Sequence, residues 1–475
     1  MITRRDLLQR AAIAAAAAAC LPCAAAAQPA AMPKRAPNIV YVLADDLGAG
    51  DLGCYGQRHF PTPRLDAMAG EGLRFTQHYT GSPVCLPSRV CLMTGMHTGH
   101  AHVRGNGRLP LRPDPQDITL PRLLKNAGYA TALCGKSGLA SNDDGGFPNA
   151  KGFDHFFGFT SHTAAHRHYP TSLWRDGKRV ALPENTGETG ESFASELFVR
   201  DALDWLGAHA DGPLFLHLAL TLPHADLAVP AKYREPFDGK FDETPIDPGR
   251  YRAEPKPKST YAGMISFVDE AVGRVLDRVR ELGIAENTLV LFASDNGAMS
   301  EGVYQREWLD SSGPLRGGKR DLYEGGIRTP HLAWWPGTIT PGGTSDHVSA
   351  FWDVVPTACE LAGVAPPPKT DGISYAPTLL GNAAAQRQHD LLYWEFHERG
   401  RAQAIRREDW KAVRKPVTEN GDGPIELYHL KDDAAEANDV AAAHPQRVAE
   451  FDKLMRENRT PHPEFRFVRR QDRAE

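Results

Sequence analysis

Short apolar runs alternate with amphipathic segments along most of the chain. The run 38–44, NIVYVLA, is apolar on both faces, which is typical of a central strand in a parallel sheet. Three later runs have the same character: 129–134, 214–220 and 288–293. Between the runs, apolar residues recur at helical spacing over 62–70, 120–127, 193–209 and 261–282. Strands that alternate with helices predict an α/β domain built around a mostly parallel central sheet flanked by helices.

The pattern changes after the three prolines at 366–368. Four short runs with strand character follow, at 391–396, 402–407, 410–414 and 425–429, and then an amphipathic helix over 445–458. We therefore expect the α/β domain to occupy 37–375. A smaller C-terminal subdomain, with an antiparallel sheet plus a helix, is expected over 385–475.

The N-terminus has the features of an export signal. Arg4 and Arg5 precede two leucines and an alanine run, as in twin-arginine signals, and 25–27 offer a small-residue cleavage site. We expect the Tat export machinery to transport the protein and 1–27 to be removed, leaving it periplasmic or secreted. A membrane anchor is disfavoured because Pro22 interrupts a short run. Lipid attachment at Cys20 or Cys23 is disfavoured because neither follows a leucine-containing lipobox.

Composition and charge exclude some classes of binding partner. The 475 residues are 41% hydrophobic and 24% charged, with a net charge of −5. No basic stripe is present, which argues against a nucleic-acid partner, and no window after the signal has the length to insert stably in a membrane. Five cysteines remain after the signal: Cys54, Cys85, Cys91, Cys134 and Cys359. Because five is odd, at least one thiol has no disulfide partner or has been modified.

Two predicted strands end in oxygen ligands. Asp45 and Asp46 follow the first strand, and Asp295 and Asn296 follow the strand at 288–293. Taken singly, each pair is typical of turn and cap residues. The carboxyl ends of parallel strands meet at one edge of a sheet, so together the pairs predict a site for Ca²⁺ or Mg²⁺.

Cys85 lies in an unusual setting, SPVCLPSRVCLMTG over 82–95. Pro87 is well suited to the first turn of a helix, so Cys85 is expected near a helix N-terminus, where an anion is favoured. A core position or a disulfide with Cys91 are the alternatives for Cys85. The intervening helix would hold the two thiols apart, and Cys91 is expected in the core.

The motif CLPSRVCLMTG at 85–95 resembles the defining motif of the type I sulfatases. The resemblance covers nearly all of 37–440, and its further motifs are the Asp-Asp strand end, GK at 135–136, GFDHFFG at 152–158, LPH at 222–224, SDNG at 294–297, GGKRDLYEGGIRTP at 317–330 and ELYHL at 426–430. It implies an alkaline-phosphatase-like fold and hydrolysis of sulfate monoesters. It also implies that a maturation enzyme oxidises Cys85 to Cα-formylglycine.

The resemblance implies roles for individual residues. The metal, for which Ca²⁺ is expected and Mg²⁺ is the alternative, would be held by Asp45, Asp46, Asp295, Asn296 and the modified Cys85. Arg89 would hold the nucleophile and the carboxylates, Lys136 and Lys319 would contact sulfate, and His224 would protonate the leaving oxygen. Taken without the family, Arg89 is read as a surface ion pair, the lysines as solvated and His224 as a core histidine.

The chain departs from the family pattern at one position. Many sulfatases read GKWHLG where this chain has GKSGLA at 135–140, so the family histidine falls on Gly138. The nearby stretch HTAAHRHYP supplies His166 and His168, which are expected to contact substrate and are the first candidates to replace the missing base. Further histidines lie close in sequence: His97, His100, His102, His155 and His162.

Three functions remain open for the sequence. The first is a sulfatase acting on a sulfated small molecule or glycan, with a carbohydrate favoured because Trp174, Trp308 and Tyr169 offer aromatic faces. The second is a phosphonate or phosphodiester hydrolase with the same nucleophile. The third is a non-catalytic, metal-stabilised binding protein, which would have no need of Cys85.

Overall fold

The computed structural model describes residues 35–107, 109–139, 144, 146–249, 251–299, 304–417 and 421–467. The predicted export signal lies outside these residues. Within the described chain, no helix combines the length and apolar character needed to cross a membrane.

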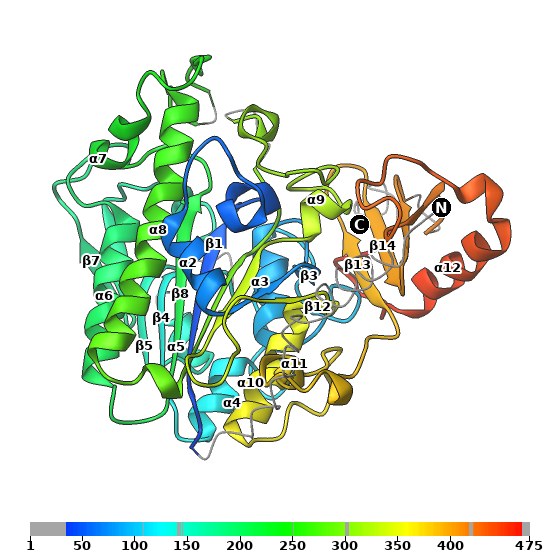
Figure 1. The fold of residues 1–475 in the computed structure, drawn as a ribbon, viewed down its shortest axis with the longest axis horizontal. Helices are drawn as coiled ribbons and strands as arrows, with labels where there is room; N and C mark the ends of the chain where they lie inside the picture. Colours follow the sequence, from blue (N-terminus) through cyan, green and yellow to red (C-terminus); the bar gives the residue numbers. More distant parts are fainter. Residues whose placement is uncertain are drawn as a thin grey trace, which may run out of the picture.

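The described residues form a large sheet with helices on both faces and a separate small sheet beside it (Figure 1). The strands are β1 (Asn38–Asp45), β2 (Leu73–Phe75), β3 (His78–Tyr79), β4 (Ala130–Lys136), β5 (His155–Phe159), β6 (Ser172–Arg175), β7 (Lys178–Ala181), β8 (Leu214–Pro223), β9 (Thr288–Ser294), β10 (His331–Trp334), β11 (Gly343–Ser345), β12 (Ser349–Ala350), β13 (Leu392–Phe396), β14 (Ala402–Arg407), β15 (Trp410–Arg414) and β16 (Ile425–His429). The α-helices are α2 (Pro63–Glu71), α3 (Cys85–Thr94), α4 (Leu120–Asn126), α5 (Phe147–Ala150), α6 (Ala194–Ala208), α7 (Ala231–Arg234), α8 (Pro257–Glu281), α9 (Glu324–Ile327), α10 (Val354–Ala362), α11 (Ala376–Leu379) and α12 (Pro445–Glu457).

The large sheet has ten strands in the order β11-β2-β10-β9-β1-β8-β4-β5-β6-β7. Its centre, from β9 to β5, is parallel, whereas β10 and β6 run antiparallel to their neighbours. The mostly parallel sheet expected from the apolar runs is therefore confirmed. The antiparallel edges are additions that the sequence pattern did not indicate, because strands of three or four residues are too short to show a period.

Strand β1 is buried on both faces because its alternate side chains enter two separate cores. Val40 and Val42 pack with α6 and α8 on one face, while Ile39 and Tyr41 pack with α3, α4 and α10 on the other. Burial on both sides explains why the strand is continuously apolar. The only carboxylate of β1, Asp45, therefore lies at its C-terminal end.

The small sheet, with the order β13-β14-β15-β16, is antiparallel and carries α12 on one face (Figure 1). It joins the main domain through a buried ion cluster in which Lys411 Nζ lies 2.9 Å from carboxylate oxygens of both Glu324 and Glu436. Trp394 Nε1 also donates to the carbonyl of Thr80 at 2.8 Å. The expected C-terminal sheet and helix are confirmed, and the sheet is fixed directly beside the segment that leads into α3.

Candidate active site

The site gathers at the carboxyl ends of the central strands. Asp45 is the last residue of β1, Lys136 is the last residue of β4, and His224 follows the end of β8. Asp295 follows β9, and its backbone N–H donates to the carbonyl of Ala44 at 3.1 Å. Parallel pairing of these strands is therefore what brings residues more than two hundred positions apart into one cluster.

Three carboxylates and an amide lie together in this cluster. The Asn296 Nδ2 group donates to Asp46 Oδ1 at 2.7 Å, and the Asp46 N–H donates to Asp295 Oδ1 at 3.2 Å. Burial, with the negative charge of Asp45, raises the pKa of Asp295 to about 7. Asn296 Oδ1 is buried without a hydrogen-bond partner among the described residues. An orphaned oxygen beside crowded carboxylates fits a divalent cation, which would bind all four side chains.

Cys85 is the first residue of α3, a helix that is buried along its whole length. Its Sγ donates to Asp45 Oδ1 at 3.3 Å, and Asp45, Asp46, Cys85 and His224 each offer a ligand atom within one small volume. Burial and the charge of Asp45 raise the pKa of the Cys85 thiol. A neutral thiol at this place is a poor nucleophile. Cys85 and Cys91 are both free, as expected, and Cys91 packs in the core.

Arg89 lies one turn beyond Cys85 and is buried rather than exposed. Its Nε donates to Asp295 Oδ2 at 2.8 Å, and its Nη2 lies 3.5 Å from Asp45 Oδ2. Its Nη1 donates to the carbonyl of Lys136 at 3.0 Å. The guanidinium thus ties together the ends of three strands and the nucleophile helix, which excludes a surface ion pair.

Two buried lysines complete the positive charge of the site. Lys136 Nζ lies 2.5 Å from Asp45 Oδ2, and Lys319 Nζ lies 2.8 Å from Asp46 Oδ2. Burial disfavours the charged form of Lys136, but Asp45 outweighs it and raises the pKa of Lys136. Burial likewise would raise the pKa of Asp45, but Lys136 and Arg89 hold it well below its usual range. Lys136 therefore stays charged although it is buried.

His224 lies on the same side as Lys319. Its Nε2 is 2.9 Å from Lys319 Nζ and 3.4 Å from Asp46 Oδ2, while its Nδ1 contacts the carbonyl of Ala225. Burial and the charge of Lys319 lower the pKa of His224 well below its ordinary value. Since Nδ1 faces a carbonyl, it carries a proton, and Nε2 is the atom that exchanges one with Lys319 or a ligand.

The two histidines from the HTAAHRHYP stretch lie differently. The ring of His166 stacks on that of His224 with centroids 4.1 Å apart, and its Nε2 is buried with no partner among the described residues. The rings of His162 and His166 are 5.2 Å apart, and His162 Nδ1 is also without a partner there. His168 is bonded on both sides, to the carbonyl of His224 at 3.0 Å and to Thr221 Oγ1 at 3.3 Å.

His162 was not among the first candidates from the sequence, yet its ring lies 5.2 Å from that of His166, which stacks on His224. Burial and the charge of Lys136 lower the pKa of His162 well below its ordinary value. The four-residue spacing from His162 to His166 was the available signal, since it allows both rings to reach one side of a single turn. Of the two first candidates, His168 has both ring nitrogens in hydrogen bonds to protein groups, whereas His166 Nε2 has no partner among the described residues.

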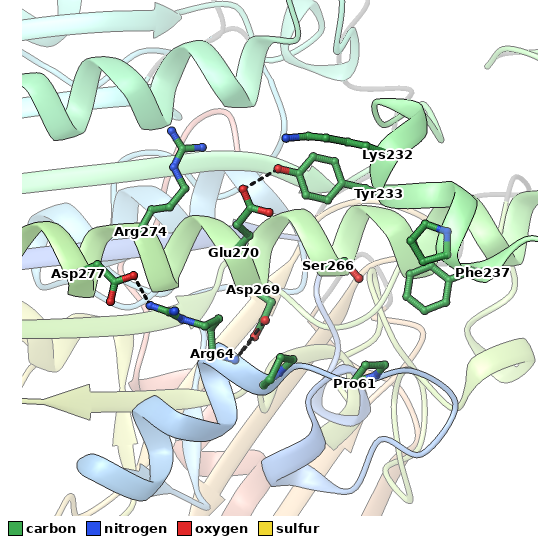
Figure 2. A pocket seen from close by; sticks show the side chains of 12 residues that line it. Pro61, Arg64, Lys232, Tyr233, Phe237, Ser266, Asp269, Glu270, Arg274 and Asp277 are labelled. Carbon is green, nitrogen blue, oxygen red and sulfur yellow. Dashed lines mark hydrogen bonds and ion pairs between the residues drawn. The ribbon is translucent and has the colours of Figure 1, made fainter.

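A groove lies elsewhere, between the start of α2, α7 and α8 (Figure 2). Its volume is about 400 Å³. Two of its charged side chains, Arg64 and Asp277, pair with each other (Figure 2), with a nitrogen–oxygen distance of 2.5 Å. Glu270 accepts a hydrogen bond from Tyr233 at 2.9 Å. None of the clustered residues at the carboxyl ends of the strands lines it, so this groove is separate from the cluster around Cys85.

Two family models match the chain. The Sulfatase model matches 37–364, and the N-sulphoglucosamine sulphohydrolase C-terminal model matches 317–460.

The chain is similar to several curated proteins. It is 35% identical to human N-acetylgalactosamine-6-sulfatase over 370 residues, which cover 72% of this chain and 66% of that protein. It is also 35% identical to human arylsulfatase A over 403 residues, covering 80% and 75%. The chain thus spans about two thirds of the length of the N-acetylgalactosamine-6-sulfatases that it matches.

Solved structures share the fold. Ps i-CgsB, solved in complex with k-i-k-neocarrahexaose, superposes with a TM-score of 0.75 at 26% identity, covering 92% of this chain and 96% of that one. A protein described in a study of glycosaminoglycan metabolism by Bacteroides thetaiotaomicron superposes with a TM-score of 0.73 at 25% identity, covering 89% and 99%.

Proposed function

This chain belongs to the sulfatase family, and on that premise we propose that it hydrolyses organic sulfate monoesters at the cluster around Cys85. The observation that carries the proposal is the position of Cys85 Sγ, 3.3 Å from Asp45 Oδ1 within a buried set of two lysines and Arg89. A sulfate ester is an anion, so burying it requires charges of the opposite sign that are already in place.

Cys85 is the proposed precursor of Cα-formylglycine, made by a maturation enzyme. When present, formylglycine supplies a hydroxyl nucleophile that is regenerated after each turnover. The free thiol would be a poor substitute, because its pKa is raised by burial and by Asp45.

Asp45, Asp46, Asp295 and Asn296 are proposed to hold a divalent cation together with the modified residue. We favour Ca²⁺ over Mg²⁺, because its larger and more flexible shell accommodates several protein oxygens as well as a ligand. The cation supplies positive charge beside the sulfate oxygens when bound. The unpartnered Oδ1 of Asn296 supports this ligand set.

The charged side chains have separate tasks. Lys136 and Lys319 bind sulfate oxygens and neutralise charge as the ester bond breaks. His224 Nε2 delivers a proton to the leaving oxygen, and it takes that proton from Lys319 Nζ, which donates to it at 2.9 Å. Arg89 bonds to the carboxylate of Asp295 and to the backbone carbonyl of Lys136, and it thereby fixes their positions relative to each other.

We propose a sulfated carbohydrate as substrate. The proposal is supported by relatives whose names include N-acetylgalactosamine-6-sulfatase and by a structural neighbour solved with an oligosaccharide. We also propose that 1–27 direct export through the Tat machinery to the periplasm or beyond, supported by the paired arginines and alanine run.

The first experiment is the mass of the tryptic peptide 75–89, FTQHYTGSPVCLPSR, from protein purified from its native host. The expected peptide has lost sulfur and has the mass of the aldehyde or its hydrate. An intact thiol in active protein would overturn this mechanism. An intact thiol in inactive protein, once a missing maturation enzyme is excluded, would favour the non-catalytic alternative.

Sulfate, phosphodiester and phosphonate esters of one chromogenic alcohol then separate the remaining candidates. The sulfate ester is expected to be hydrolysed with the highest kcat/KM. A clear preference for phosphonate or phosphodiester would replace the sulfatase assignment with the related hydrolase.

A further inference from the structure

A second, smaller pocket borders the catalytic cluster. Its volume is about 170 Å³, and it lies between the segment that carries Lys319 and the loop that joins β13 to β14. Five of its lining side chains are cationic and one is acidic: Lys319, Arg320, Arg399, Arg401, Lys415 and Asp321. Because Lys319 also contacts Asp46 and His224, the pocket and the proposed sulfate site share a wall.

The local charges do not cancel. Arg320 is paired with Glu398, and Lys415 Nζ lies 3.1 Å from Asp321 Oδ1. Arg399 is exposed, and no carboxylate in the described part of the chain forms an ion pair with it. The lining of the pocket therefore carries more positive than negative charge.

The loop that presents the arginines has an unfavourable backbone. Arg399, Gly400 and Arg401 follow one another with φ of 47°, 91° and 60°. The left-handed region is accessible to glycine but costly for arginine. Two arginines next to a cavity thus have a strained backbone conformation. Strain of this kind is retained at binding sites.

Hydrogen bonds tie the pocket to the nucleophile segment on both sides of Cys85. The Arg320 N–H donates to the carbonyl of Pro83 at 2.8 Å. On the other side, the Leu86 N–H donates to Asn106 Oδ1 at 3.2 Å, and the Asn106 N–H donates to Glu398 Oε1 at 3.3 Å. The arginine loop is thus held at a defined position relative to Cys85.

We propose that this pocket binds a second anionic group of the substrate. The preferred substrate is then a sulfated saccharide that carries, besides the sulfate to be removed, a further sulfate or a carboxylate. Arg399 and Arg401 act as specificity-determining residues because their guanidinium groups match the oxygens of either anion. The inference rests on the proposed sulfatase function and deepens it by naming the substrate class.

The test compares three disaccharides that share one scissile sulfate: one with no other charge, one with a second sulfate and one with a carboxylate. The ratio of kcat/KM for each dianionic substrate to that for the monoanionic one is measured. It is expected to exceed one and to fall about tenfold or more in the Arg399→Ala/Arg401→Ala double variant. Arg387→Ala, an exposed arginine outside the pocket, serves as the matched control and should leave the ratio unchanged. The dianionic disaccharide with the larger kcat/KM ratio shows whether the pocket prefers a sulfate or a carboxylate.

Calorimetry keeps this inference separate from the proposed function. Metal-replete Cys85→Ala protein is expected to bind the disulfated or the carboxylated disaccharide more tightly than the monosulfated one, and to lose that preference when both arginines are replaced. Equal affinities, together with a ratio that stays within twofold in the double variant, would overturn the pocket assignment. Failure to hydrolyse any sulfate ester would overturn the proposed function instead, and the binding data would still decide on the pocket.

Discussion

Arg89 occupies the space that a side chain at Gly138 would need. A Cβ atom added to Gly138 would lie 2.2 Å from Arg89 Cδ, and Gly138 has a φ of 59°. The chain therefore cannot hold both the family histidine at 138 and Arg89 in its present conformation. The absence of the histidine therefore goes with a different packing of this site, in which Arg89 fills the space beside Gly138. In the same cluster, the ring of His166 stacks on that of His224.

Restoring the histidine is expected to harm the protein. Gly138→His should lower kcat/KM for an aryl sulfate at least tenfold, because Arg89 would be pushed away from Asp295 and Asp45. Gly138→Ala should act in the same direction, since the clash begins at Cβ. Gly283→Ala is the matched control: its φ is 68°, yet nothing lies within 4 Å of its added Cβ. Increased activity in Gly138→His would show that Arg89 can relocate without cost.

Replacing His166 and His168 should have different effects. His166→Ala is expected to lower kcat about tenfold to a hundredfold with little change in melting temperature, because its Nε2 makes no structural hydrogen bond. His168→Ala should instead destabilise the fold by about 1–3 kcal/mol, since it leaves the His224 carbonyl without its donor. Steady-state kinetics and thermal melts of both variants check this. Equal effects on kcat and melting temperature in the two variants would contradict the division of roles.

The role of His224 is tested through the leaving group. His224→Ala should lower kcat for an alkyl sulfate by about 10²–10⁴, because the departing alkoxide needs a proton. A nitrophenyl sulfate, whose leaving oxygen is far less basic, should lose much less. The measurement is kcat for both esters with each protein. A loss that is the same for both esters would assign His224 to substrate binding instead.

Metal binding is tested without any turnover. Adding Ca²⁺ to chelator-treated Cys85→Ala protein should raise its melting temperature, because a ligand at a hundred times its Kd stabilises the fold by about 2.7 kcal/mol. Asp295→Asn should remove most of this response. Asp51→Asn is the control, since Asp51 is also buried but is bonded to Tyr261 at 2.7 Å outside the cluster. A Ca²⁺ response that survives in Asp295→Asn would argue against the proposed ligand set.

A pH-dependent stability term is expected from Glu395, a buried residue of β13. Its oxygens accept from Arg104 at 2.7 Å, His397 at 2.9 Å and Arg459 at 2.8 Å. Burial alone would raise the pKa of Glu395, but His397 and Arg104 hold it well below its ordinary value. Because the folded pKa is depressed, the stabilisation is present above the unfolded pKa near 4.5 and is lost as the pH falls below it.

Glu395→Gln should therefore lower the free energy of unfolding by about 3–5 kcal/mol at neutral pH. The difference from the parent protein should shrink steadily below about pH 4.5. Urea denaturation at several pH values between 3.5 and 7 measures it, with the exposed Glu191→Gln as a control that should match the parent. A difference that does not change with pH would show that packing, and not the charge of Glu395, is what the substitution removes.

The sequence was most informative where local pattern and local chemistry coincide. Strand β1 was predicted as 38–44 and is observed as Asn38–Asp45, because burial on both faces requires an unbroken apolar run. Strands β14, β15 and β16 begin and end where their patterns predicted. The metal-ligand and nucleophile candidates were recognised for a related reason, since oxygen pairs at strand ends and the motif around Cys85 are contiguous in the chain.

Other features required the tertiary structure because no local signal encodes them. The 2.2 Å approach of a Gly138 Cβ to Arg89, the stacking of His166 on His224 and the placing of Arg399 beside Lys319 each join segments distant in sequence. Such contacts are decided by strand order and by how the small sheet docks, not by the periodicity of any one segment. The sequence thus determined which chemical groups the protein carries and on which elements they lie. The tertiary structure alone decided which of them meet, because meeting depends on the packing of whole elements against each other.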